Sequence, residues 1–95
     1  MTYAQQVWQA TVSILLNRHF GLLLIDTEFC EDANVAEVQK AGIRPFEVIN
    51  ELVDKYQLTR LGNNLYRPRS LYLNARDELI AALEAGVTLT IAVNS

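Results

Sequence analysis

The spacing of apolar residues changes along this chain, and that change constrains the fold more than any other feature of the sequence. From about Ala4 to Phe20, apolar side chains recur at the three- and four-residue intervals of a helix, and Gly21 follows as a left-handed stop. In residues 87–93, "VTLTIAV", apolar and polar residues alternate with the period of two that is typical of a strand. The chain is therefore predicted to combine helices and strands.

A short apolar run and two helical segments lie between these ends. Leu22–Ile25 is too short for a helix and is followed by Asp26, which favours a buried strand. Asn34–Ala41 begins with the capping-box pattern "NVAE" and predicts a short helix. Pro45–Tyr56 begins with a residue suited to the first helical position, which predicts a third helix with one apolar stripe: Phe46, Ile49, Leu52, Val53 and Tyr56.

The second half of the chain is predicted to contain a hairpin and a fourth helix. Residues 58–61 and 65–67 flank "GNN", which tolerates the positive φ of a tight turn. A helix capped by Ser70 is expected to end at Gly86, with one face formed by Ala75, Leu79, Ala82 and Leu83. The predicted order is α-β-α-α-β-β-α-β. This is an α+β fold in a winged-helix-like arrangement, with a RelE-like arrangement as the alternative.

Composition limits the class of protein. Of the 95 residues, 51% are hydrophobic and 20% charged, which predicts one folded domain over residues 1–95. The net charge of -3 disfavours attraction to nucleic acid and to anionic lipid. The single cysteine, Cys30, cannot form an intramolecular disulfide, and no apolar run is long enough to span a membrane. A cytoplasmic protein is expected.

The chain's one histidine, His19, lies in the last turn of the first predicted helix. An imidazole there can act as a general base, or it can cap carbonyl groups and interact with the helix dipole. Because no partner motif accompanies it, we interpret His19 as structural, and Asp26 and Thr27 as turn and capping residues. No catalytic residue is predicted.

An acidic run suggests a calcium loop, with Glu37 at the twelfth position counted from Asp26; the run consists of Asp26, Glu28, Glu31 and Asp32. Counted from Asp26, however, Glu31 occupies the sixth position, where an EF-hand loop needs glycine, and Cys30 the fifth, where it needs an oxygen ligand. We predict that these carboxylates are solvated, with contact to a basic surface of a partner as the alternative. Neither a metal nor a cofactor is predicted.

Arginine and aromatic side chains follow the third helix, as in a wing that contacts a phosphate backbone: Arg60, Tyr66, Arg67 and Arg69. The helix that would enter the groove carries carboxylates, which phosphates repel. A winged-helix nucleic-acid-binding regulator and a RelE-like ribonuclease toxin are the two alternative functions.

The predicted strand 87–93 has no charge and no proline. An unpaired edge of this kind can pair with another chain. A homo-oligomer formed through this strand is one expectation, and pairing within its own sheet is the other.

Two spaced motifs resemble the CbtA (YeeV) family of bacterial type IV toxins. "VWQATVSILLNRHFGLLLIDTEF" resembles the family's tryptophan helix and its following His-x-Gly-Leu-x-Leu-x-Asp-Thr-x-Phe signature, and "VINELVDKYQLTR" resembles a later run. We interpret the signature residues as structural: Trp8, His19, Gly21, Asp26, Thr27 and Phe29.

The resemblance implies a cytosolic toxin that is not an enzyme. It implies binding to the bacterial cytoskeletal proteins FtsZ and MreB and inhibition of their polymerisation, which blocks division and elongation. It also implies a CbeA (YeeU)-type antitoxin that opposes the toxin by stabilising the filaments.

The predicted binding site lies away from the signature. It combines the outward face of the third helix with two arginines of the hairpin: Glu47, Asn50, Glu51, Asp54, Arg60 and Arg67. Glu51 stands where the family has an aromatic residue linked to target binding, and an acid there loses the apolar contact that usually dominates an interface.

Overall fold

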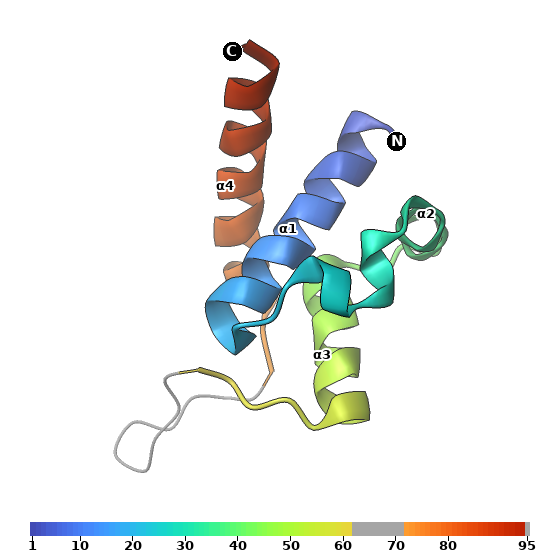
Figure 1. The fold of residues 1–95 in the computed structure, drawn as a ribbon, viewed down its shortest axis with the longest axis vertical. Coiled ribbons are helices and arrows are strands. Elements are labelled where there is room, and N and C mark those ends of the chain that lie inside the picture. Colours follow the sequence, from blue (N-terminus) through green and yellow to red (C-terminus); the bar gives the residue numbers. More distant parts are fainter. Residues whose placement is uncertain (62–71, 95) are drawn as a thin grey trace.

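A computed structural model describes residues 1–61 and 72–94, and within these ranges the chain forms helices joined by short turns (Figure 1). The elements are α1 (Tyr3–Phe20), the 3₁₀ turns η1 (Leu24–Asp26) and η2 (Glu28–Cys30), α2 (Asp32–Lys40), α3 (Pro45–Tyr56) and α4 (Ala75–Asn94). The described ranges contain no strand. The predicted α+β fold is therefore wrong, and so are its winged-helix-like and RelE-like arrangements.

Helix α1 lies at the centre, with α4 along one side and α2 and α3 on the other (Figure 1). Its residues Val12, Leu15 and Leu16 are fully buried. The same core continues into the other three helices through Val35, Val48, Ile49 and Ala81. Burying a leucine or isoleucine side chain stabilises a fold by about 1.5–3 kcal/mol. The core around α1 therefore holds the four helices together.

The two helices with the clearest apolar stripes are confirmed. α1 ends at Phe20, and Gly21 follows with a left-handed φ of 69°. The Gly21 N–H donates to the Asn17 carbonyl at 3.1 Å, which satisfies one of the last carbonyl groups of the helix. α3 begins at Pro45 and ends at Tyr56, as its sequence predicts.

The apolar run 22–25 forms a turn and not the predicted strand. The Leu22 N–H donates to the Leu16 carbonyl at 3.2 Å and closes the end of α1. The Asp26 carboxylate then accepts the Leu23 N–H at 3.1 Å. A strand needs a second strand to pair its backbone groups, and these turn hydrogen bonds satisfy them locally instead.

The start of α2 differs from the predicted capping box. The helix begins at Asp32 with Glu31 as its N-cap, so Asn34 lies inside the first turn. The Asn34 side-chain amide donates to the Glu28 carbonyl at 2.8 Å and ties α2 to η2. The box between Asn34 and Glu37 is therefore wrong.

Helix α4 starts at Ala75, where Asn74 and Asp77 cap it reciprocally. The Asp77 N–H donates to the Asn74 side chain at 3.0 Å, and the Asn74 N–H donates to the Asp77 carboxylate at 3.1 Å. This is the arrangement of a capping box. The predicted cap Ser70 lies outside the described residues.

The end of α4 overturns the predicted terminal strand. The helix passes through Gly86 and includes residues 87–93. Each residue added to an existing helix gains a backbone hydrogen bond, whereas a strand here would need a partner that the described residues do not provide. The expected homo-oligomer through a strand edge loses that basis, because residues 87–93 are helical.

The inward face of α4 also differs from the prediction. Ala81 and Ala85 are fully buried, whereas Leu79 and Leu83 are 59% and 64% exposed. Small side chains at a helix contact let the two axes approach closely. The predicted core face, which contains Leu79 and Leu83, is therefore wrong.

A buried carboxylate joins α4 to α3. Glu78 accepts hydrogen bonds from Nε and Nη2 of Arg44 at 3.0 and 2.6 Å, and from the Phe46 N–H at 3.1 Å. Both Arg44 nitrogens donate to the same oxygen, Oε2, while Oε1 accepts the Phe46 N–H, and hydrogen bonds between charged groups are among the stronger polar contacts in proteins. They fix the first turn of α3 against the first turn of α4.

The predicted hairpin falls mostly outside the described residues. Residues 58–61 are described and form no strand. The Leu61 N–H instead donates to the His19 carbonyl at 2.6 Å, which holds this segment against the end of α1. The turn "GNN" and residues 65–67 are not among those described.

Candidate protein-binding surface

The outward face of α3 is acidic. Glu47, Glu51 and Asp54 are spaced four and three residues apart, which places them on one side of the helix, and all three are exposed. None of them forms an ion pair with a described side chain. We call these three residues the acidic face. Glu47 accepts the Arg44 N–H at 3.1 Å and Asp54 accepts the Tyr72 hydroxyl, but all three carboxylates stay exposed at the surface.

Asp54 also interacts with the segment before α4. Its carboxylate accepts a hydrogen bond from the Tyr72 hydroxyl at 2.5 Å. This hydrogen bond, together with the negative charge of Asp54, raises the pKa of Tyr72 above its ordinary value of 10.0. Asp54 therefore connects the acidic face of α3 to Tyr72, in the segment before α4.

Asn50 was predicted to bind a partner, but its amide contacts the backbone of Leu73. The side-chain NH₂ donates to the Leu73 carbonyl at 2.9 Å, and the Leu73 N–H donates to the side-chain oxygen at 2.8 Å. Both polar ends of the amide are thus used within the chain. Asn50 is half-buried and serves to hold residue 73 against α3.

Arg60 is buried, although it was predicted to lie on the binding surface. Its side chain lies with Nη2 at 3.2 Å from Nδ1 of His19 and at 3.7 Å from Oδ1 of Asp77. The residue is 9% exposed. Arg60 therefore connects the end of α1 to the first turn of α4. Arg67 lies outside the described residues.

Of the signature residues, Trp8 and Phe29 are buried in the core, whereas Gly21 and Asp26 are exposed. Trp8 donates from Nε1 to the Ile43 carbonyl at 3.1 Å, and its ring centroid is 5.8 Å from that of Phe29. Thr27 accepts the Phe29 N–H at 3.2 Å and donates to the Leu24 carbonyl at 2.9 Å. These contacts fix the turns η1 and η2 against α1.

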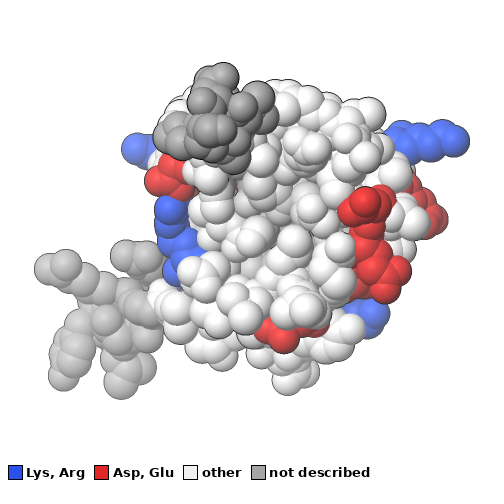
Figure 2. All heavy atoms as spheres, turned by 45° about the horizontal axis from the view of Figure 1, so that its top comes forward, with Lys and Arg blue, Asp and Glu red and all other residues white. Residues whose placement is uncertain are grey.

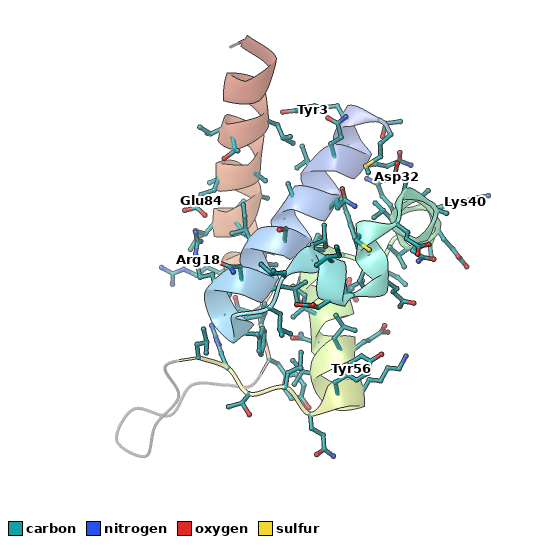
Figure 3. All side chains as sticks on the ribbon, viewed as in Figure 1. Tyr3, Arg18, Asp32, Lys40, Tyr56 and Glu84 are labelled. Atoms are coloured by element: carbon teal, nitrogen blue, oxygen red, sulfur yellow. The ribbon has the colours of Figure 1, made fainter. Side chains whose placement is uncertain are left out.

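A cleft of about 320 Å³ opens between these turns and the end of α3. Its walls come from Leu22 and the segment 26–28 on one side and from Leu52, Tyr56 and Leu58 on the other. We call it the α3 cleft. Tyr56 is 61% exposed and lies at the free end of α3 (Figure 3).

The α3 cleft was not predicted from the sequence, because Tyr56 was interpreted as part of the core stripe. The next residue, Gln57, has a left-handed φ of 52° and turns the chain away from the helix axis. This turn brings Leu58 beside the last turn of α3. The one sequence feature that could have indicated the cleft is the tyrosine at the last position of the apolar stripe, at the end of the helix.

Charge is unevenly placed on the surface. Figure 2 shows one face on which acidic and basic side chains lie around the margin and the middle is uncharged. On the side of α1 and α4, Arg18 and Glu84 point towards one another and form an exposed ion pair (Figure 3). Both residues also line a shallow groove with Leu83 and Val87.

Metal-ligand clusters and membrane-spanning helices are both absent from the described part of the chain. Residues 1–61 and 72–94 contain no group of three or more histidine, cysteine, aspartate or glutamate side chains placed to hold a metal ion. Among the helices of these residues, none is both long and apolar enough to cross a membrane.

Comparison with known proteins identifies the family. A family model described as CbtA_toxin of type IV toxin-antitoxin system matches residues 6–79, which is most of the chain. The chain belongs to the CbtA toxin family. The matched residues extend from α1 to the first turn of α4 and include both the acidic face and the α3 cleft. The resemblance inferred from the sequence motifs is confirmed.

Two relatives of known name also match. The cytoskeleton-binding toxin CbtA of Escherichia coli (strain K12) is 34% identical over 84 residues, which cover 86% of this chain and 68% of that protein. The toxin CbtA of Escherichia coli O6:H1 (strain CFT073) has the same identity and coverage. No solved structure matches the chain.

Proposed function

We propose that this CbtA-family toxin acts by binding the bacterial cytoskeletal proteins FtsZ and MreB and blocking their polymerisation. The family match over residues 6–79 carries the proposal. The relative named cytoskeleton-binding toxin, at 34% identity, supports the class of target. FtsZ and MreB are the members of that class that the sequence resemblance implies.

We propose that the toxin works by stoichiometric binding and not by catalysis. The acidic face of α3 offers three carboxylates that no described side chain neutralises. Such a surface favours a partner with basic residues, because opposite charges speed encounter and fix the orientation of docking. His19, the predicted candidate for a general base, is in contact with the buried Arg60.

The nucleic-acid-binding alternative loses its structural basis. It depended on a winged helix, in which α3 would enter the groove, and the described residues form no such fold. The acidic face would also meet the phosphates with Glu47, Glu51 and Asp54. The RelE-like ribonuclease alternative depends on a β-sheet, and the described residues form no sheet.

In the cell, the proposal places the toxin in the cytoplasm. A CbeA (YeeU)-type antitoxin would oppose it by stabilising the filaments. Induced expression in Escherichia coli should stop division and distort cell shape, and co-expression of the antitoxin should restore growth. Normal growth and shape in cells that accumulate the folded protein would contradict the proposal.

The acidic face can be tested with one charge reversal. Glu51→Lys should weaken binding to the purified filament protein, because Glu51 is exposed and forms no ion pair with a described residue. Glu37→Lys, an exposed site on α2 with the same change of charge, is the matched control. Equal binding by both variants and the unmodified protein would exclude the acidic face as the contact.

A further inference from the structure

The α3 cleft is formed where two left-handed residues turn the chain. Gly21, with φ of 69°, directs the chain from α1 into η1, and Gln57, with φ of 52°, ends α3. Leu22 follows the first turn and Leu58 follows the second, and both line the cleft. The cleft is therefore a product of the fold, placed between elements that the core holds rigidly.

The interior of the α3 cleft is apolar and its rim is acidic. Leu22, Leu52 and Leu58 line it together with the ring of Tyr56. Asp26 and Glu28 supply carboxylates at its edge. The two carboxylates differ, because Asp26 accepts the Leu23 N–H whereas Glu28 is exposed and has no ion pair with a described side chain.

The ring of Tyr56 already attracts one cation. The Lys55 ammonium lies 5.3 Å from its centroid. An aromatic face draws cations through its quadrupole, and adjacent carboxylates strengthen the same preference. Lys55 already occupies this position beside the ring, so it is the carboxylates of Asp26 and Glu28 that favour a lysine or arginine of a partner at the edge of the cleft.

The volume of the cleft limits what it can hold. About 320 Å³ lies at the lower end of the range for small-molecule sites, and two of the polar residues that line the cleft, Asp26 and Thr27, already form hydrogen bonds with the backbone of their own turns. A protein interface, in contrast, commonly places one large apolar side chain in a pocket of this kind, with charged residues around it.

We propose that the α3 cleft receives one large apolar side chain of the cytoskeletal partner, flanked on the partner by lysine or arginine residues that pair with Glu28 and Asp26. The inference rests on the proposed function, since it names the part of the partner that this toxin recognises. It assigns the specificity of binding to the turns after α1 as well as to the acidic face.

The test uses two variants of the cleft, each with a matched control. Tyr56→Ala removes one wall of the cleft, and Tyr3→Ala removes a tyrosine of similar exposure from the start of α1. Glu28→Lys reverses a charge at the rim, and Glu37→Lys makes the same change on α2. All four positions are exposed, so the variants are expected to fold, and circular dichroism checks this.

Affinity for purified FtsZ and MreB is then measured by isothermal titration calorimetry at two salt concentrations. Tyr56→Ala should weaken binding about tenfold or more, as expected for an aromatic residue at the centre of a contact. Glu28→Lys should weaken binding at low salt and reduce its dependence on salt. Tyr3→Ala and Glu37→Lys should bind as the unmodified protein does.

The outcomes separate this inference from the proposed function. If the unmodified protein binds a filament protein and neither cleft variant weakens binding, the cleft proposal is overturned while the function stands. If only Tyr56→Ala weakens binding, the proposed pairing with lysine or arginine residues of the partner is overturned. If the unmodified protein binds neither filament protein, the proposed function fails, and the cleft proposal fails with it.

Discussion

The side-chain amide of Asn50 pairs with both backbone groups of Leu73, through hydrogen bonds of 2.9 and 2.8 Å. Leu73 itself is buried in the core, two residues before α4 begins. One side chain on α3 thus positions the segment that leads into α4.

Asn50→Ala should lower the free energy of unfolding by about 1–3 kcal/mol, because it leaves the N–H and carbonyl of Leu73 without these partners. Urea denaturation measures the change. Glu51→Ala, an exposed neighbour, should change it by less than about 0.5 kcal/mol. An Asn50→Ala variant with unchanged stability and lost target binding would return Asn50 to the binding surface that the sequence suggested.

The buried carboxylate of Glu78 provides a second stability prediction. Glu78→Gln should cost about 2–3 kcal/mol, since it removes the charge that pairs with Arg44 at a side chain only 11% exposed. Glu84→Gln makes the same substitution in the exposed pair with Arg18, on the same helix, and should cost less than about 1 kcal/mol. Equal losses in thermal denaturation would show that burial does not distinguish the two pairs.

The hydrogen bond between Tyr72 and Asp54 predicts a dependence on pH. The folded pKa of Tyr72 is raised above the unfolded value of 10.0, so the folded state holds the hydroxyl proton more tightly. The resulting stabilisation is fully present below pH 10.0 and is lost as pH rises through the folded pKa. Titration of tyrosine absorbance should show a late component that Asp54→Asn removes, and its persistence in that variant would contradict the assignment.

Two substitutions in helix α4 test which of its faces packs against the core. Leu83→Ala should change stability by less than about 0.5 kcal/mol, because the side chain is 64% exposed. Ala81→Leu should cost about 1–3 kcal/mol, because Ala81 is fully buried against the core and a larger side chain would overpack it. The reverse order of effects would support the face of α4 predicted from the sequence.

The sequence was informative where one element carried several consistent local features. α1 has a helical apolar period and a glycine immediately after it, and α3 has proline at its first position and a stripe of buried residues. These features act within one helix and need no knowledge of its neighbours. For that reason both helices could be placed closely from the sequence.

The strands failed because their patterns are local while strand pairing is not. The alternation in residues 87–93 describes the order of side chains, but a helix that is capped at Asn74 and packed on α1 can extend through the same residues. The run 22–25 shows the same limit, since Ile25 is 75% exposed despite its apolar neighbours. Neither pattern reveals whether a partner strand exists.

The candidate site was predicted in part. The spacing of Glu47, Glu51 and Asp54 could be read as one exposed face, because helical geometry fixes it. Burial of Arg60 and the pairing of Asn50 with Leu73 depend on segments distant in the sequence. The α3 cleft depends on the left-handed turn at Gln57, which the sequence did not indicate.

The most direct test of the account is sedimentation of purified FtsZ and MreB, each polymerised alone with increasing amounts of this protein. Pelleted filament should fall as the toxin approaches equimolar concentration, for at least one of the two filament proteins. The fall should be smaller with Glu51→Lys than with Glu37→Lys. Unchanged pellets for both filament proteins, with the folded toxin in excess, would contradict the central claim.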